Sequence, residues 1–171
     1  MIRSNAQTTL RLSSTSIRLF AGVIVGPVLV IGLAGCELSV PTDPDGTLTT
    51  VSGGELRVGV SPDPGLVSAV KVTPSGPVID VVTSFSETID AQPEWTIASE
   101  ETLVGMLEDG TLDLAVGGFT AESPWTDRAG MTRGYTAITG ADGREIVFLV
   151  PLGENAFLTA LETFLDEKVG S

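Results

Sequence analysis

The sequence predicts a single small α/β lobe with three layers and a mainly parallel sheet. Two observations carry this prediction. Strand-like and helix-like segments alternate in the order strand, helix, strand, helix, strand, which favours a parallel sheet covered by helices. An apolar run over Leu112–Gly118, broken only by Asp113, is typical of a strand buried on both faces. No internal repeat is found.

The first half of this pattern begins with a strand over Glu55–Val60, where polar and apolar residues alternate. Two prolines and a glycine within Ser61–Gly65 end it, and residues 66–77 are irregular. Apolar residues then fall at helical spacing until the helix ends near Gln92–Pro93. The apolar positions are Val78, Val81, Val82, Phe85 and Ile89.

The second half begins with a short strand over Trp95–Ala98. Ser99 is a suitable N-cap for the next helix, which Gly110 ends. After the apolar run, residues 119–143 are predicted to be a loop, and Arg144–Val150 is predicted to be the closing strand. The last helix presents one apolar face, made of Phe157, Leu158, Leu161, Phe164 and Leu165.

The N-terminal segment is basic and then apolar. Three arginines precede an apolar stretch over Leu19–Leu33, and Leu33-Ala34-Gly35-Cys36 ends the segment with the only cysteine of the chain. This segment resembles a bacterial lipoprotein signal. The resemblance implies cleavage before Cys36, a thioether-linked diacylglycerol on Cys36, and a lipid anchor at the extracytoplasmic side of the cell membrane. An ordinary signal peptide or a short anchor helix with an incidental cysteine is the alternative.

These features divide the chain into a signal peptide at 1–35, a lipid-anchored flexible linker at 36–54 and a domain at 55–171. The linker is predicted from Pro41, Pro44, an Asp-Gly turn and a run of Thr, Ser and Gly without apolar periodicity.

The composition excludes several functions. The chain from Cys36 onward holds all 22 acidic residues and six of the nine basic ones, so six minus 22 gives a net charge of −16. Such a charge repels nucleic acids, and no nucleic-acid partner is expected. The chain has no histidine, which removes Ser–His and Cys–His catalysis and the usual zinc sites. We expect no catalytic residue, no metal site and no cofactor.

Several motifs of the domain resemble one lobe of the family 3 periplasmic solute-binding proteins, the amino-acid-type receptors of ABC importers. Glu55–Val60 is similar to their first strand, usually L-R-V-G-V. Leu107–Thr120 is similar to their L-x-x-G-x-x-D-x-x-x-x-G-M-T signature, and Tyr135 stands where the family ends its F-S-x-P-Y segment. The resemblance implies domain 1 of a type II periplasmic binding protein.

Two departures from the family limit what the resemblance implies. Full receptors insert a second lobe after the Tyr135 region, but only Thr136–Gly143 separates that region from the closing strand, so the second lobe is expected to be missing. The family's carboxylate-binding arginine falls at Trp125, and Arg128 is not at the motif position. The carboxylate clamp and the amino-acid specificity are therefore not carried over.

Ligands in open α/β sheets bind at the carboxyl ends of the strands. The loops after Val60 and Gly118 lie there, and the candidate ligand-binding residues are Ser61, Asp63, Gly118, Phe119, Thr120, Trp125 and Arg128. Purely structural roles are the alternative: Trp125 covering a sheet edge, Arg128 pairing with Asp127 or Glu122, Thr120 capping its loop, and Asp63 serving as a turn residue.

The leading hypothesis is a membrane-anchored solute-binding lipoprotein. It would be a substrate-binding or accessory component of a transport system, with a small solute and a transporter permease as partners. A ligand-free interaction module of the cell envelope is the second hypothesis. An enzyme is not expected, because no pair of carboxylates has a spacing that singles it out.

Overall fold

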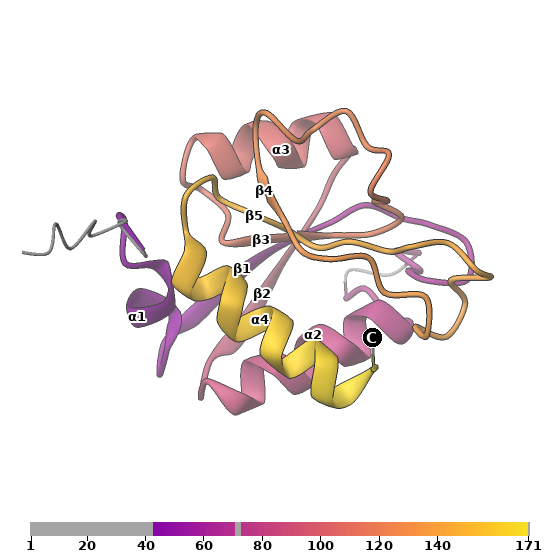
Figure 1. The fold of residues 1–171 in the computed structure, drawn as a ribbon, viewed down its shortest axis with the longest axis horizontal. Coiled ribbons are helices and arrows are strands. Elements are labelled where there is room, and N and C mark those ends of the chain that lie inside the picture. The colour runs from indigo at the N-terminus through magenta and orange to yellow at the C-terminus, as the bar shows by residue number, and fades with distance from the viewer. Residues whose placement is uncertain (1–42, 71–72, 171) are drawn as a thin grey trace, which may run out of the picture. The chain divides into compact units, whose positions relative to one another are not determined.

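The computed structural model describes residues 43–70 and 73–170, which form a three-layer α/β lobe. One helix, α3 (Glu100–Glu108), covers one face of the sheet, while α2 (Pro77–Thr88) and α4 (Asn155–Lys168) cover the other (Figure 1). This arrangement confirms the predicted fold class. The predicted signal peptide and Cys36 lie outside the described residues.

The sheet has five strands and is mostly parallel. Its order is β2 (Gln92–Ile97), β1 (Glu55–Val60), β3 (Leu114–Val116), β5 (Leu149–Val150) and β4 (Gly130–Met131). Strand β1 pairs in parallel with β2 and with β3, whereas β5 runs antiparallel to both β3 and β4. The last part of the chain therefore returns against the direction of the central strands.

Several element bounds differ from those predicted. Strand β2 starts at Gln92, where the preceding helix was expected to end, and the third strand is shorter than its apolar run. The predicted closing strand over 144–150 contributes only β5 and single bridges from Ile146 to Thr120 and to Tyr135. Strand β4 lies within the predicted loop. Apolar runs indicate burial, but they do not specify how many of their residues pair.

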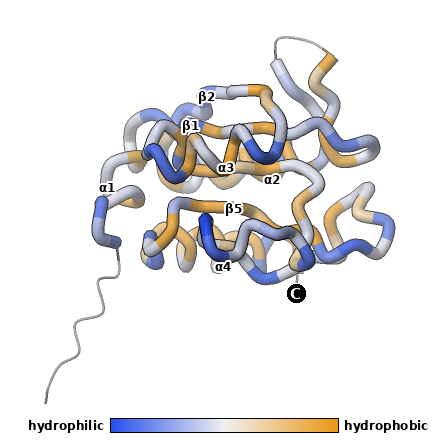
Figure 2. The backbone as a smooth tube through the Cα atoms, turned by 90° about the horizontal axis from the view of Figure 1, so that it is seen from above, coloured by the Kyte–Doolittle hydropathy of each residue, from blue (hydrophilic) through white to orange (hydrophobic). Residues whose placement is uncertain are grey.

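The larger hydrophobic core lies between the sheet and the helices α2 and α4. Alternate residues of β1 (Leu56, Val58 and Val60) point to this side, as the period of two of a strand requires. Phe85 of α2 packs against Phe157 of α4 with ring centroids 5.9 Å apart. Figure 2 shows the hydrophobic residues concentrated along β1 and β5.

The smaller core lies between the sheet and α3. Ser99 begins this helix as predicted, because its side chain accepts a hydrogen bond from the Thr102 N–H. Leu103 packs so closely on β1 that a Cβ at Gly59 would lie 2.6 Å from its Cδ2 atom. The sequence L-R-V-G-V thus needs glycine at its fourth position because α3 sits directly on the strand.

Part of the predicted flexible linker is folded, which corrects the 36–54 boundary. Residues Thr47–Val51 form the short helix α1, and both terminal residues of α1 are buried. The buried carboxylate of Glu154, at the start of α4, accepts hydrogen bonds from the amides of Asp45 and Thr47, each at 2.9 Å. These contacts were not visible in the sequence because Glu154 is distant along the chain.

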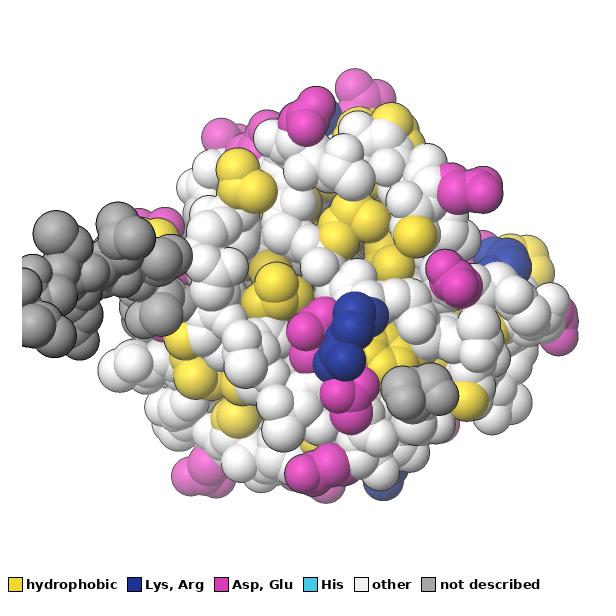
Figure 3. All heavy atoms as spheres, in the orientation of Figure 1, with side chains coloured by type: hydrophobic (Ala, Val, Ile, Leu, Met, Phe, Trp, Pro, Cys, Tyr) yellow, Lys and Arg dark blue, Asp and Glu magenta, His cyan; other side chains and the backbone are white. Residues whose placement is uncertain are grey.

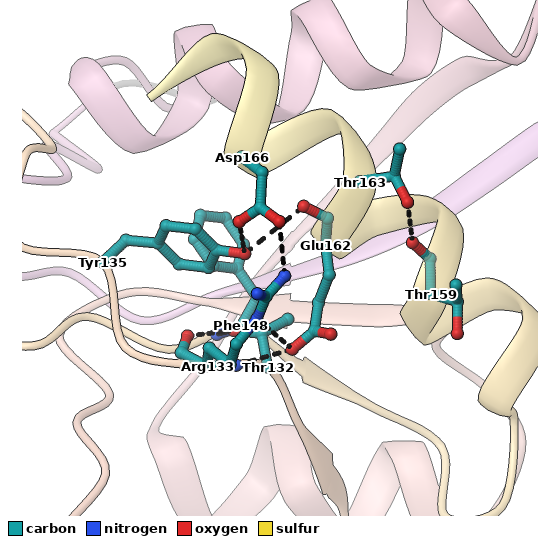
Figure 4. A network of polar contacts seen from close by, with 8 residues as sticks. All are labelled: Thr132, Arg133, Tyr135, Phe148, Thr159, Glu162, Thr163 and Asp166. Carbon is teal, nitrogen blue, oxygen red and sulfur yellow. Dashed lines mark hydrogen bonds and ion pairs between the residues drawn. The ribbon is translucent and has the colours of Figure 1, made fainter. Parts of the chain in front are cut away.

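Helix α4 is fastened to the segment after β4 by polar contacts (Figure 4). The Arg133 amide donates to Glu162 at 2.7 Å, and the Arg133 guanidinium donates to Asp166 at 2.6 Å. The Tyr135 hydroxyl donates to the same Asp166 carboxylate at 3.2 Å. Burial, together with this hydrogen bond, raises the pKa of Tyr135 to about 12. Tyr135 therefore has a structural role.

The surface reflects the acidic composition. Figure 3 shows acidic side chains scattered over one face, with basic side chains in contact with acidic ones. Among residues 43–70 and 73–170, no helix has the length and apolar character needed to cross a membrane. The same residues contain no group of three or more histidine, cysteine, aspartate or glutamate side chains that could hold a metal ion.

The contact between Asp43 and Glu154 predicts a pH-dependent stability. Burial, and then the hydrogen bond to Glu154, raises the pKa of Asp43 from 3.8 to about 6. The stability from protonated Asp43 is fully present below pH 3.8 and is lost as the pH rises through 6. We expect Asp43→Asn, which resembles the protonated acid, to be more stable than the wild type at pH 7.5 by roughly 1–2 kcal/mol, since the full shift is worth about 3 kcal/mol.

Urea unfolding at pH 5 and pH 7.5 measures this difference. The advantage of Asp43→Asn should fall to about half at pH 5, because that pH lies midway between the unfolded and the folded pKa of Asp43. An advantage of equal size at both pH values would show that the carboxyl does not titrate in this range.

Candidate functional site

The candidate site lies at the carboxyl ends of β1 and β3. Ser61 directly follows β1 and is buried, and its amide donates to the Val116 carbonyl at 2.9 Å. Gly117 packs on the same turn, since a Cβ there would lie 2.6 Å from the Ser61 carbonyl oxygen. The two loops predicted to meet at this edge do meet, and they do so through backbone contacts.

Asp63 is the central polar group of this edge. Its carboxylate forms a two-pronged ion pair with the Arg144 guanidinium: Nη1 donates to Oδ2 at 3.0 Å and Nη2 donates to Oδ1 at 2.8 Å. The loop after β1 places Asp63 there through a tight turn, in which the Asp63 carbonyl accepts the amides of Leu66 and Val67. Side-chain exposures of 20% for Asp63 and 37% for Arg144 leave the pair open to solvent on one side.

Gly118 lies directly against the Asp63 carboxylate. A Cβ at Gly118 would lie 2.7 Å from Cγ of Asp63, closer than two unbonded carbon atoms approach. The glycine thus allows a carboxylate to rest on the backbone that follows β3. Gly118 was predicted as a residue whose backbone can approach a ligand, and in this structure it approaches a side chain of the same chain.

Arg144 is held in position independently of Asp63. Its Nε donates to the Ala141 carbonyl at 3.2 Å, and the turn that carries it packs on the loop after β1. At that contact, a Cβ at Gly140 would lie 2.8 Å from the Gly65 carbonyl carbon. The ion pair with Asp63 raises the pKa of Arg144 above its usual value, so this guanidinium stays charged.

A groove of about 560 Å³ adjoins the ion pair. It is lined by Asp63 itself and by neighbouring residues of the loop, among them Pro62, Pro64, Leu66 and Val67. The lining is largely apolar apart from the Asp63 carboxylate. The edge therefore combines a charged centre with an apolar channel, which is the usual composition of a small-molecule site.

Two neighbouring candidates have structural roles. Phe119 is fully buried in the smaller core, which corrects its assignment as a ligand contact. Its side chain belongs to the α3 layer because residues that follow a strand continue to alternate between the two faces. Thr120 is half-buried, and its amide donates to the Ser123 hydroxyl at 3.1 Å, so the side chain that caps this loop is that of Ser123.

Trp125 and Arg128 form a separate cluster, which corrects the expectation that they join Asp63. The Arg128 guanidinium lies 5.6 Å from the Trp125 ring centre and pairs with Glu108 at the end of α3. The expected partners, Asp127 and Glu122, are not the ones found. Trp125 packs against the smaller core.

Arg128 lines a second groove, of about 590 Å³, at the opposite end of the sheet. That groove also holds the Arg57–Asp113 pair, whose Nε to Oδ2 distance is 3.0 Å. The Asp113 carboxylate accepts the Arg57 amide as well, at 2.8 Å, so it locks the starts of β1 and β3 together. Both arginines of this groove are ion-paired, as Arg144 is, but the groove lies at the amino ends of β1 and β3, so we do not assign it as the site.

Sequence reasoning missed Arg144. The residue begins the predicted closing strand, and a strand parallel to β3 would have placed it at the opposite end of the sheet. Because β5 runs antiparallel, Arg144 lies instead beside the carboxyl ends of β1 and β3. The glycine-rich turn just before it, too short for a crossover helix, was the available signal for an antiparallel return.

No protein-family model matches the chain, and a search of curated proteins found no match. Solved structures do match its fold. A mutant of the arginine-bound form of domain 1 from TmArgBP has a TM-score of 0.61 at 18% identity, covering 70% of this chain and 96% of that one.

Two further solved structures match the same fold. Tv2483 bound to L-arginine has a TM-score of 0.60 at 12% identity, covering 72% of this chain and 88% of that one. The arginine-bound form of truncated ArgBP from T. maritima has a TM-score of 0.57 at 11% identity, covering 72% and 99%. At these identities the likeness shows the fold, which is that of one domain of a solute-binding protein.

The contact between Gly118 and Asp63 predicts a position-specific cost. We expect Gly118→Ala to destabilise the domain by about 2 kcal/mol, because the added methyl group must displace a carboxylate that the turn and Arg144 hold. Gly105→Ala is the matched control: it lies in α3 with no atom within 4 Å of its Cβ, and alanine there should stabilise by about 0.5–1 kcal/mol. Urea unfolding measures both, and equal effects would contradict the contact.

Proposed function

We propose that this chain binds a small solute at the carboxyl edge of its sheet. The observation that carries the proposal is the convergence of three features at that edge: a charged guanidinium on Arg144, a backbone opened by Gly118, and an apolar groove beside them. A few polar groups at the end of an apolar channel are the usual means of fixing a small molecule.

A single lobe is compatible with this proposal. Domain 1 from TmArgBP, whose fold resembles this chain, is described in an arginine-bound form. One lobe covers only one side of a ligand, so we expect modest affinity unless a second protein surface covers the other side. We propose no enzymatic activity for the chain.

We also propose that the domain is anchored to the cell membrane. The lipoprotein-like segment ending at Cys36 supports a lipid anchor that holds the domain on the extracytoplasmic side of the cell membrane. Solute binding at that location supports a role as a substrate-binding or accessory component of a transport system, with a permease as partner.

A second candidate is an interaction module that has kept the fold without a solute. One observation favours it: Asp63 already neutralises Arg144 and occupies the space beside Gly118. Solute binding to the wild-type chain distinguishes the two candidates.

We expect a thermal-shift screen of the purified chain against amino acids, polyamines, organic acids and simple ions to yield a stabilising solute. At one hundred times the dissociation constant the stabilisation is about 2.7 kcal/mol, a rise of several degrees in melting temperature. Arg144→Ala should abolish the rise, whereas Arg128→Ala, in the other groove, should keep it. A cooperative transition that no solute shifts would favour the interaction module.

We expect Cys36→Ser to move the chain from the membrane fraction to the soluble fraction, because the serine hydroxyl does not accept the thioether-linked lipid. Fractionation of expressing bacteria, with mass spectrometry of the N-terminal peptide, measures both location and modification. Ser52→Ala, a change at an exposed serine, serves as the control. A wild-type N-terminal peptide that carries no lipid on Cys36 would contradict a lipid anchor at this residue.

A further inference from the structure

We propose that Asp63 occupies, from within the chain, a binding site for the carboxylate group of a solute. The inference rests on the proposed function and adds to it the chemical class of the solute and a competing internal group. The solute is a small organic acid or amino acid, and its carboxylate replaces that of Asp63 on Arg144.

The Arg144 guanidinium has the geometry of a carboxylate-binding group. The Arg144 guanidinium offers Nη1 and Nη2 to both oxygens of one carboxylate, at 3.0 and 2.8 Å. This two-pronged arrangement is the strongest way in which arginine binds a carboxylate. On the other side, the carboxylate rests against Gly118, where any side chain would collide with it. The space is thus shaped for a carboxylate, and Asp63 supplies one.

Asp63, rather than Arg144, is the residue whose side chain can leave the ion pair. Arg144 keeps its orientation through the bond from Nε to the Ala141 carbonyl, which does not involve Asp63. Asp63 is held in its loop by backbone bonds to Leu66 and Val67. Its carboxylate can therefore rotate away from Arg144 while those backbone bonds remain. A vacated site would keep its guanidinium in place for another carboxylate.

The groove beside the ion pair has exposed apolar walls. Its volume is about 560 Å³, and it is lined by Asp63 and by apolar residues, of which Pro62, Pro64 and Val70 are exposed. A solute whose carboxylate sits on Arg144 would place its aliphatic part in that groove. The class of solute follows from this pairing of a guanidinium with an apolar channel.

The internal carboxylate lowers the affinity for external ones. A partly exposed ion pair is worth about 1 kcal/mol, so the closed pair is present about five times as often as the open one. The apparent affinity falls by the fraction of molecules that are open. Removing Asp63 should therefore tighten carboxylate binding by about fivefold.

The test is a titration of the purified full-length chain with sodium acetate, and then with sodium butyrate, at constant ionic strength set by sodium chloride. We expect Asp63→Ala to bind acetate about fivefold more tightly than the wild type, and butyrate more tightly than acetate. The double variant Asp63→Ala/Arg144→Ala should lose this binding. Isothermal calorimetry and the rise in melting temperature both measure it.

Two further variants serve as controls. Asp63→Asn keeps the shape of the side chain but weakens its hold on Arg144, so it should show a smaller gain, and it replaces Asp63→Ala if that variant does not fold. Glu108→Ala frees Arg128 in an exposed pair whose carboxylate does not rest against a glycine, and it should gain no acetate binding. Equal acetate affinity in the wild type, Asp63→Asn and Asp63→Ala would overturn the inference.

The experiments distinguish a failure of this inference from a failure of the proposed function. If a solute stabilises the wild type while no Asp63 variant gains carboxylate binding, the inference fails and the solute site stands. If the Asp63 variants gain carboxylate binding while no solute stabilises the wild type, Asp63 is the natural occupant, and the site is closed in the native chain.

Discussion

The contact between the loop after β1 and the turn at 136–143 is the constraint on which the candidate site depends. It consists of a close backbone approach at Gly65 and Gly140 and the ion pair of Asp63 with Arg144. The chain reverses direction at this turn, so β5 runs antiparallel to β3. Without that reversal, Arg144 would lie at the far end of the sheet, and the carboxyl edge would lose its charged centre.

Much of the fold follows from local patterns. The alternation in Glu55–Val60, the Ser99 cap and the apolar face of α4 depend on neighbours in the sequence, and each was predicted with its approximate bounds. Helix α1 could not be predicted, because its docking depends on the Glu154 carboxylate, which lies more than a hundred residues away. The direction of β5 was missed for the same kind of reason.

The candidate site was predictable only in part. Backbone geometry at the ends of β1 and β3 places Ser61, Asp63 and Gly118 together, and a strand-and-loop pattern is sufficient to infer that. Side-chain partners are decided by packing. Arg128 follows the strand in sequence but pairs with Glu108 of α3 and lies over Trp125, whereas Arg144, distant in sequence, completes the site.

The site also explains how one fold can support two functions. A guanidinium that faces a glycine can receive a carboxylate from a solute or from its own loop, and the balance between them sets the affinity. In the described part of the chain, Asp63 fills this position. A receptor of modest affinity and a closed interaction module would then differ in the strength of one ion pair rather than in their folds.

The most direct measurement of this account is the NMR signal of the Arg144 Nε–H during titration of the full-length chain with sodium butyrate, whose carboxylate fits the proposed site and whose alkyl chain fits the apolar groove. The Arg57 Nε–H, paired with Asp113 at the other end of the sheet, is an internal reference. The account predicts that the signals of Arg144 and of the Gly118 amide shift together while that of Arg57 stays fixed. A shift confined to Arg57, or no shift at either end, would contradict it.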